Sequence, residues 1–443
     1  MHQASTFPPP GRAGYALGVL MLATFTALLD RYLIGLLLEP IRADFLISDT
    51  QASLLQGFAF AIFYSVLGLP FGRLVDRGNR RNIIVAGIIV WSLTTIACGF
   101  AQSYWTLFLA RLGVGFGEAC LAPAAYSLIT DLFPPRRHAR ALAWYTGASI
   151  VGGGGSFIIG AEALRFAADL AATHSELTGI EPWRLTFMIV GVPGLLVALL
   201  MLTFSEPRRQ ALGAQTDLPS WRDLAKFMRK IRGPLFWLIA AGSAMTIAGS
   251  GTMGWLAVFL YRTYDLPVTT GGHWIGLILI ICGTLGGMIS GWIGDSRYVA
   301  GLRGQRFNVI LFGGVVAAGL AILFPLMPTA TVALAVFSLQ STAYNVAACA
   351  APTVLQDILP NRFKGQVGAF YWLCVGLIGF GGGSTAVALV TDHVFADEAA
   401  LRYSLAIVGP SAILVAAACV LLGRASYQRL RDEMAAGVRQ VEV

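Results

Sequence analysis

The sequence predicts an all-α membrane protein with twelve membrane-spanning helices, arranged as two similar halves of six. Three observations predict it. Of the 443 residues, 56% are hydrophobic and only 12% are charged, about half the charged fraction of a soluble protein. Twelve apolar stretches approach the roughly 20 residues that a helix needs to cross a bilayer. Patterns from the first half of the chain return roughly 220 residues later.

The twelve spans follow one another through short connections, apart from one polar and basic segment, Ser205 to Gly233. The predicted spans are 14–38, 51–71, 82–101, 104–131, 138–168, 184–204, 234–261, 272–294, 307–327, 329–358, 364–391 and 400–423. Within the long connection, apolar and basic residues alternate with a helical spacing, which predicts an amphipathic helix along the inner membrane surface. The predicted domains are a tail (1–13), a bundle (14–204), a cytoplasmic amphipathic linker (205–233), a second bundle (234–425) and a tail (426–443).

The basic residues orient the predicted bundle. If the N-terminus is cytoplasmic, the cytoplasmic segments hold 24 of the 31 Lys and Arg residues, the bias that cytoplasmic loops show. The opposite side holds five: Arg42, Arg165, Arg184, Arg262 and Arg402. Both termini are therefore expected in the cytoplasm, and the first apolar run is expected to be a retained helix. Short loops and the absence of an Asn-x-Ser/Thr sequon favour a bacterial inner membrane.

Composition also argues against several other classes of protein. The net charge of +8 lies in short loops between apolar runs, not on one polar face, so no nucleic acid is expected as a partner. The six cysteines are scattered through apolar stretches, which predicts neither a disulfide framework nor a metal site. The glycine clusters at 113–117 and 152–155 lack the lysine of a phosphate-binding loop and are expected to allow close helix packing. We expect no cofactor, no catalytic residue and no enzymatic activity.

Two motifs occur once in each half. Gly72-Arg-Leu-Val-Asp76 follows the second span and Gly291-Trp-Ile-Gly-Asp295 follows the eighth; Asp131-Leu-Phe-Pro134 ends the fourth span and Asp357-Ile-Leu-Pro360 ends the tenth. Internal repetition of this kind is typical of transporters whose binding site lies where the two repeats meet.

The first of these motifs extends to Gly78-Asn79-Arg80-Arg81 and resembles the loop signature of the major facilitator superfamily. That resemblance implies the major facilitator fold. It also implies that Asp76, Arg77, Arg80, Arg81 and Asp295 act in gating, by holding one state of the transporter.

A second set of motifs spans residues 26 to 160. Asp30-Arg31-Tyr32 lies in the first span, and Arg111-Leu-Gly-Val-Gly-Phe-Gly-Glu118-Ala119 leads to Ala122-Pro123 in the fourth. This set resembles the spinster branch of the superfamily, whose members move lysophospholipids or sphingosine-1-phosphate, with proton coupling proposed for some. The resemblance implies that the first and fourth spans line a shared central cavity.

Four ionisable side chains lie at depth: Asp30, Arg31, Arg111 and Glu118. Asp30 lies roughly 24 Å into its span and Glu118 roughly 21 Å into its own. Burial and a neighbouring arginine act in opposite directions on the proton affinity of a carboxylate, so Glu118 beside Arg31 is predicted to exchange a proton near neutral pH. Glu118 and Asp30 are the predicted proton-coupling residues, while Arg31 and Arg111 are predicted to bind substrate. A purely structural set of ion pairs is the alternative.

Polar and aromatic residues in other spans are candidates for the cavity wall. With Tyr32, the predicted substrate-binding residues are Gln56, Tyr64, Trp255, Tyr344, Asn345 and Trp372. Because the charges at depth lie in the first half, the cavity would have one charged and one apolar wall, which suits an amphiphile.

The sequence thus predicts a secondary active, proton-linked transporter that works by alternating access, as a monomer. Its expected partners are a lysophospholipid or similar amphiphile, protons and membrane lipid. A proton-coupled carrier of small organic anions or sugars from the same superfamily is the alternative, and a receptor or channel without alternating access is a third hypothesis.

Overall fold

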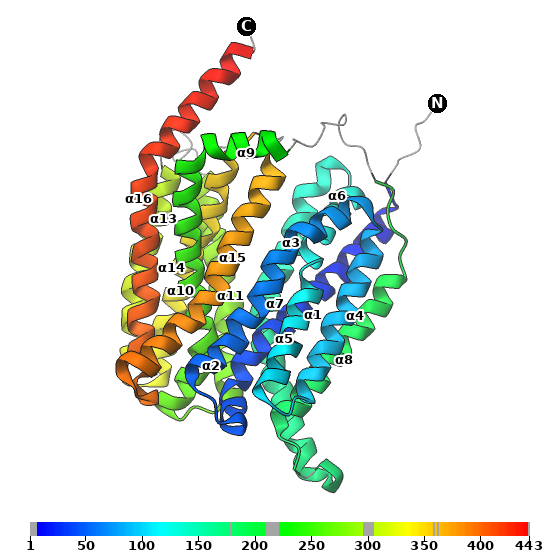
Figure 1. The fold of residues 1–443 in the computed structure, drawn as a ribbon, viewed down its shortest axis with the longest axis vertical. Coiled ribbons are helices and arrows are strands. Elements are labelled where there is room, and N and C mark those ends of the chain that lie inside the picture. Colours follow the sequence, from blue (N-terminus) through cyan, green and yellow to red (C-terminus); the bar gives the residue numbers. More distant parts are fainter. Residues whose placement is uncertain are drawn as a thin grey trace. The chain divides into compact units, whose positions relative to one another are not determined.

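The structure is a computed structural model that describes residues 7–177, 179–209, 221–295, 305–357, 359–360 and 363–441 (Figure 1). Side chains are described throughout these ranges except for Leu69, Trp221 and residues 294–295, 305–307, 350–353, 356–357, 364–365 and 431–441.

The described residues contain twelve helical segments long and apolar enough to cross a membrane, which confirms the predicted number and order of spans. The first six spans are formed by α1 (Pro10–Phe45), α2 (Asp49–Ser53) with η1 (Leu54–Phe58) and α3 (Ala59–Arg77), α4 (Arg80–Gly99), α5 (Tyr104–Glu118) with α6 (Leu121–Leu132), α7 (Pro135–Thr173) and α8 (Pro182–Leu202). The other six are formed by α10 (Arg232–Tyr264), α11 (Val268–Asp295), α13 (Gln305–Leu323), α14 (Ala330–Asp357), α15 (Lys364–Leu389) with η4 (Val390–Phe395), and α16 (Leu401–Val441).

These helices form two compact units. Unit 1 comprises residues 1–214 and 253–280, and unit 2 comprises residues 215–252 and 281–443. The hairpin 253–280, which is the end of α10, its turn and the start of α11, thus belongs to unit 1, although both of its helices continue into unit 2. The domain boundaries expected from the sequence stay a prediction.

Unit 1 packs through small residues. In this unit α5 lies against both α3 and α4 (Figure 1). A Cβ atom on Gly115 would come 2.5 Å from the carbonyl oxygen of Phe60, and one on Gly117 would come 2.6 Å from the backbone nitrogen of Trp91. Only glycine allows backbones to approach this closely. The structure therefore confirms the packing role expected for this glycine cluster.

Two of the spans that the sequence predicted as single helices are interrupted. The fourth span ends its first helix at Glu118, turns at Ala119 and Cys120, and begins α6 at Leu121. Pro123 explains the break, because in a continuous helix it could not donate a hydrogen bond to the carbonyl of Ala119 and its ring would clash there. The second span contains one wide, π-helical turn, η1, which includes Gln56. Such turns are frequent at functional sites.

Unit 2 carries the short helix α9 (Trp221–Lys230), which falls within the predicted amphipathic linker. Leu224 is buried in the apolar core of the unit, and the ring of Phe227 stacks on Phe363 at 4.3 Å. Arg222 and Lys226 are exposed. The helix is therefore amphipathic, and its apolar residues Leu224, Phe227 and Met228 pack against the core of the unit. Its location at the inner membrane surface stays a prediction.

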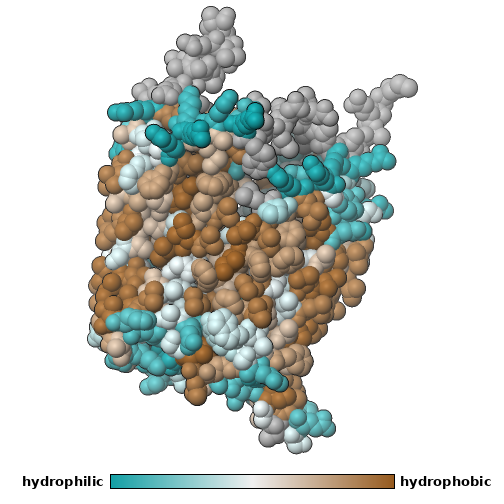
Figure 2. Space-filling view, viewed as in Figure 1, coloured by the Kyte–Doolittle hydropathy of each residue, from teal (hydrophilic) through white to brown (hydrophobic). Residues whose placement is uncertain are grey.

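The surface pattern fits residence in a bilayer. On the face shown in Figure 2, each unit has a broad apolar region, with hydrophilic side chains gathered at its ends. Large apolar side chains such as Leu109, Leu199, Phe312 and Leu422 are more than half exposed, as expected where lipid is the solvent.

Candidate functional site

The pair Arg31 and Glu118 forms the centre of the candidate site. Arg31 lies in α1, and Glu118 is the last residue of α5 before the break in the fourth span. One carboxylate oxygen, Oε2 of Glu118, accepts hydrogen bonds from Nη2 of Arg31 at 2.6 Å and from Nε at 3.2 Å. The Glu118 side chain is 1% exposed and that of Arg31 is 17% exposed. The carboxylate is therefore enclosed by protein, while the Arg31 side chain remains partly accessible.

Two aromatic rings from α3 also contact the guanidinium of Arg31. The guanidinium carbon lies 4.5 Å from the centre of the Phe60 ring and 4.6 Å from that of Tyr64, and the two rings stack on each other at 4.9 Å. A cation over an aromatic face is attracted by the ring, most strongly where water is excluded. The guanidinium therefore has contacts besides its carboxylate partner.

Asp30 and Arg111 form the second half of the cluster. Nη1 of Arg111 donates to the backbone carbonyl of Asp30 at 3.1 Å, and the Arg111 side chain is fully buried. Nε and Nη2 of Arg111, Oδ1 of Asp30 and Oε1 of Glu118 are buried without a hydrogen-bond partner among the described residues. Buried polar atoms that lack a hydrogen-bond partner are costly, and charged side chains within a membrane are candidates for proton or substrate sites.

The remaining candidates in unit 1 have more local contacts. The ring of Tyr32 packs against Phe157 of α7 at 5.7 Å. Nε2 of Gln56 donates to the backbone carbonyl of Gly254 in the hairpin at 2.7 Å. Trp255, also in the hairpin, is fully buried, and its ring lies 5.9 Å from the guanidinium of Arg262. The contact of Gln56 thus joins the second span to the hairpin within unit 1, whereas the contact between Trp255 and Arg262 lies within α10.

Three candidates belong to unit 2. The hydroxyl of Tyr344 donates to the carbonyl of Met245 at 2.9 Å. Nδ2 of Asn345 donates to the carbonyl of Ser341 in the same helix at 2.9 Å. Trp372 is 57% exposed and packs edge-on against Tyr371. The polar groups of Tyr344 and Asn345 are thus engaged by backbone within their own unit.

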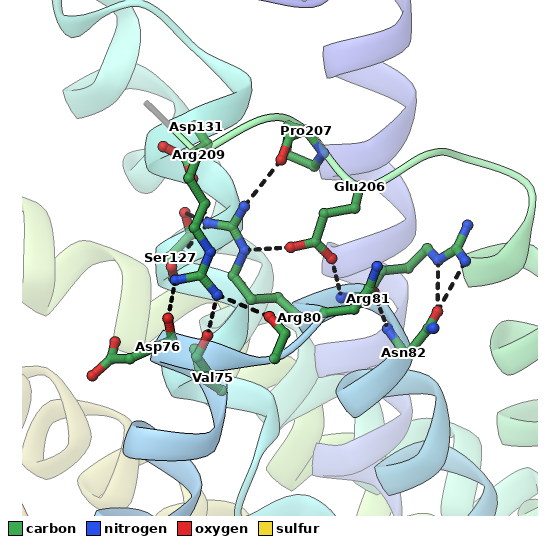
Figure 3. A network of polar contacts seen from close by, with 12 residues as sticks. Val75, Asp76, Arg80, Arg81, Asn82, Ser127, Asp131, Glu206, Pro207 and Arg209 are labelled. Carbon is green, nitrogen blue, oxygen red and sulfur yellow. Dashed lines mark hydrogen bonds and ion pairs between the residues drawn. The ribbon is translucent and has the colours of Figure 1, made fainter. Parts of the chain in front are cut away.

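The predicted gating residue Arg80 is the hub of a buried network, drawn in Figure 3. Its side chain is 1% exposed and pairs with Asp131 and, at 2.7 Å, with Glu206. It also donates to the hydroxyl of Ser127 at 3.0 Å and to the carbonyl of Pro207 at 3.2 Å. Arg80 therefore joins the start of α4 to the end of α6 and to the segment that follows α8.

The residues near Arg80, including the other predicted gating residues, have different environments. The backbone nitrogen of Arg81 donates to the other oxygen of Glu206 at 3.0 Å, and Arg209 donates to the backbone carbonyls of Val75, Asp76 and Gly78 (Figure 3). The side chains of Asp76 and Arg77 are exposed. The side chain of the fifth predicted gating residue, Asp295, lies outside the described residues.

The sequence analysis missed several participants. Phe60 was not foreseen because an aromatic residue in an apolar span carries no distinctive signal. Glu206 was assigned to a linker, although its position directly after the sixth span offered a hint. The acidic partners of Arg184 and Arg262 were also missed: Asp44 pairs with Arg184 at 2.7 Å, and Glu39 pairs with Arg262 at 2.9 Å. The available signal was the predicted position of both arginines on the non-cytoplasmic side, where basic residues are few and an acidic partner can be expected.

Apolar helices long enough to span a membrane, with a cluster of charged side chains buried in unit 1, are typical of a membrane transport protein. The chain belongs to the major facilitator superfamily, whose family model matches residues 20–383, and its relatives place it in the spinster branch. It is 31% identical over 65% of its length to an "MFS-type efflux pump" of Mycolicibacterium smegmatis, covering 63% of that protein. It is 32% identical to "Protein spinster homolog 1" of Homo sapiens, over 57% of this chain and 47% of that one.

A third relative is the "Sphingosine-1-phosphate transporter SPNS2" of Xenopus tropicalis, 29% identical over 56% of this chain and 46% of that one. The chain thus matches about half the length of the spinster relatives. Among solved structures, an inward-facing bacterial homolog of the human lysosomal transporter Spinster matches 96% of this chain and 98% of its own, with 28% identity and a TM-score of 0.78. A D-xylose–proton symporter matches with a TM-score of 0.71 at 15% identity, which reflects the shared fold alone.

Proposed function

We propose that this protein is a secondary active transporter that moves a lysolipid-like amphiphile by alternating access, with proton movement linked through Glu118 and Asp30. The observation that carries the proposal is the pair of Glu118 and Arg31, in which a buried carboxylate binds the guanidinium of a partly exposed arginine that also contacts two aromatic rings.

Coupling would follow from competition for Arg31. While Glu118 is ionised, its Oε2 atom occupies Nε and Nη2 of Arg31. Protonation removes the negative charge, so the guanidinium becomes free to bind an anionic head group. Its planar fork matches the oxygens of phosphate or carboxylate. Proton binding to Glu118 and substrate binding to Arg31 then depend on each other, which is sufficient to couple proton movement to substrate movement.

The proposed substrate class rests on the chemistry near Arg31 and on the relatives. The rings of Phe60 and Tyr64 beside the guanidinium offer an apolar surface next to a cationic anchor. The sequence places the deep charges in the first half of the chain only. A molecule with one anionic head and a long apolar tail suits this arrangement, and one relative carries the name of a sphingosine-1-phosphate transporter.

The same proposal includes a role for the network around Arg80 and the orientation of the protein in the membrane. Arg80 and Glu206 would act as part of a cytoplasmic latch that closes and opens during the cycle, with Asp76, Arg77, Arg81 and Asp295 beside it. The basic loops support cytoplasmic termini in a bacterial inner membrane. We further propose that the protein works as a monomer.

Ligand-dependent thermal stability in lipid nanodiscs tests the substrate class. Lysophosphatidic acid should stabilise the native protein, whereas short-chain organic phosphates and sugars should not. Arg31→Gln should abolish the shift, and Arg165→Gln should keep it, because Arg165 is an exposed arginine paired only at 3.8 Å with Glu162. Stabilisation by a small organic anion or sugar, with none by the lysolipid, would contradict the proposal and favour a hydrophilic substrate.

A further inference from the structure

Two hydroxyl groups of α4 lie in the interior of unit 1 without a hydrogen-bond partner. Ser92 and Thr95 lie one turn apart and are fully buried, and neither Oγ of Ser92 nor Oγ1 of Thr95 has a partner among the described residues. Thr94, between them, donates to the backbone carbonyls of Val90 at 2.8 Å and Trp91 at 3.0 Å, as hydroxyls within helices often do. A buried hydroxyl without a partner is costly, so Ser92 and Thr95 are candidates for binding a ligand.

The hydroxyl of Thr95 lies beside the charged cluster of the candidate site. It is a polar neighbour of the Asp30 carboxylate in α1, although the geometry of this contact is not that of a direct hydrogen bond. Oδ1 of Asp30 and Nε and Nη2 of Arg111 in α5 are also buried without a partner in the described part of the chain. The charges of both residues act on the thiol of Cys98, one turn further along α4. Helices α1, α4 and α5 thus bring unpaired polar atoms together around Thr95.

The unpaired atoms continue one turn back along α4, at Ser92. A Cβ atom on Gly194 of α8 would collide with Oγ of Ser92 and would lie 3.6 Å from Nε1 of Trp91. That indole nitrogen is likewise buried without a partner among the residues described. Side chains three positions apart on a helix have Cβ atoms about 5–6 Å apart. The hydroxyls of Ser92 and Thr95 are therefore close enough to share bridging water molecules.

The chemistry of the unpaired atoms selects the ligand. Arg111 and Trp91 offer only N–H donors, an ionised Asp30 offers only acceptors, and the two hydroxyls can do either. A chloride ion would be repelled by the carboxylate, and a sodium ion would be repelled by the guanidinium. Water both donates and accepts, and buried water typically makes about three hydrogen bonds to polar groups that are otherwise unpaired. Water is therefore the ligand that suits this set of atoms.

We infer that ordered water binds between Asp30, Thr95 and Arg111, and that Thr95 is a positioning residue that holds this water for proton exchange with Oδ1 of Asp30. A second water would lie one turn away, at Ser92 and Trp91. The first water can donate to an ionised carboxylate and accept from a protonated carboxyl, so it serves both states of Asp30. The role in proton exchange rests on the proton linkage through Asp30 proposed above, whereas the binding of water does not.

Radiolytic labelling of the full chain in lipid nanodiscs tests the bound water. An X-ray pulse converts water to hydroxyl radicals, which oxidise the side chains next to it, and mass spectrometry locates the products. Cys98 and Trp91 are fully buried beside the proposed waters, and Met201 is fully buried in the apolar core of unit 1. All three side chains are of readily oxidised types. Cys98 and Trp91 should be labelled, whereas Met201 should not.

Substitutions in α4 assign each water to its residue. Thr95→Val keeps the shape of the side chain without the hydroxyl and should remove most of the labelling of Cys98, while Thr95→Ser should retain it. Thr94→Val is the matched control and should leave the labelling unchanged, because the Thr94 hydroxyl is bonded to its own helix. Ser92→Ala should lower the labelling of Trp91 more than that of Cys98.

Transport by proteoliposomes tests the positioning role. Thr95→Val should slow the gradient-driven uptake of labelled lysophosphatidic acid about fivefold, the effect of one hydrogen bond, and should leave exchange without a gradient near the native rate. Thr95→Ser and Thr94→Val should both behave as native protein does. Gradient-driven uptake at the native rate in folded Thr95→Val that has lost the labelling would overturn the positioning role.

Two other results would overturn the inference that Thr95 holds a water. One is that Cys98 and Trp91 stay as free of label as Met201, and the other is that the labelling of Cys98 survives Thr95→Val. Labelling that depends on Thr95 in a protein without lysolipid flux would keep the water site and reject the proposed function. The failure of the inference and the failure of the proposed function are thus distinguishable.

Discussion

At the scale of single residues, Arg31 is the group on which we propose that proton and substrate meet. Its guanidinium contacts Glu118, Phe60 and Tyr64 together. We predict that Arg31→Lys weakens lysolipid binding about tenfold or more, because a charge-assisted hydrogen bond contributes about 1.5–3 kcal/mol and lysine lacks the fork. Titration of labelled lysophosphatidic acid into nanodiscs measures this. Equal affinity in Arg31→Lys and native protein would show that only the charge matters.

Glu118 leads to a prediction about pH. If an ionised Glu118 competes with the anionic head group for Arg31, binding to native protein weakens as the pH rises through the titration of this carboxyl. Glu118→Gln stays neutral at every pH, so its affinity should be high and nearly independent of pH between about 5 and 8, where lysophosphatidic acid keeps at least one negative charge. The same nanodisc titration measures both profiles. A variant that keeps the native pH dependence would assign the proton to another group.

At the scale of secondary-structure elements, the contact of α5 with α4 positions Glu118. We predict that Gly117→Ala lowers the free energy of unfolding by about 1–3 kcal/mol, because the new Cβ atom would press on the backbone of α4 at Trp91. Gly147→Ala in α7 is the matched control. No atom lies within 4 Å of its Cβ position, and alanine there should stabilise the helix by up to about 1 kcal/mol. Equal stability of the two variants in thermal unfolding would contradict this account.

The network around Arg80 joins three elements, and its loss should be costly. Arg80→Gln leaves the buried carboxylate of Asp131 and the partly exposed carboxylate of Glu206 without this partner, so we predict a loss of about 3–5 kcal/mol in unfolding free energy. The exposed Arg77 is the control, and Arg77→Gln should change stability by less than about 0.5 kcal/mol. Thermal unfolding in the same detergent compares the two. A small effect of Arg80→Gln would mean that the network contributes little to stability.

At the scale of the whole molecule, the fold could be predicted from the sequence because a bilayer imposes a length on each apolar helix. The meeting of Arg31 and Glu118 could also be predicted, because the family resemblance implies that the first and fourth spans line one cavity and because charges at similar depth in a membrane need partners. The break after Glu118 depends on Pro123, and the wide turn at Gln56 has no local sequence signal. The hairpin 253–280 joins unit 1 through Arg262, whose partners Glu39 and Asp49 lie more than 200 positions away. Such pairing depends on tertiary packing.

Alternating access makes a further prediction for the whole molecule. A carrier that exposes its site to one side at a time exchanges labelled for unlabelled substrate across the membrane. Proteoliposomes loaded with unlabelled lysolipid should therefore take up labelled lysolipid faster than empty ones. Equal uptake by loaded and empty vesicles would indicate a channel-like path instead.

The most direct test of the central claim is uptake of labelled lysophosphatidic acid by proteoliposomes, with and without an imposed pH gradient, for native protein and for Glu118→Gln. The account predicts accumulation that depends on the gradient in native protein and is lost in the variant, while exchange without a gradient persists. Accumulation that is the same with and without the gradient, or that is unaffected by Glu118→Gln, would contradict it.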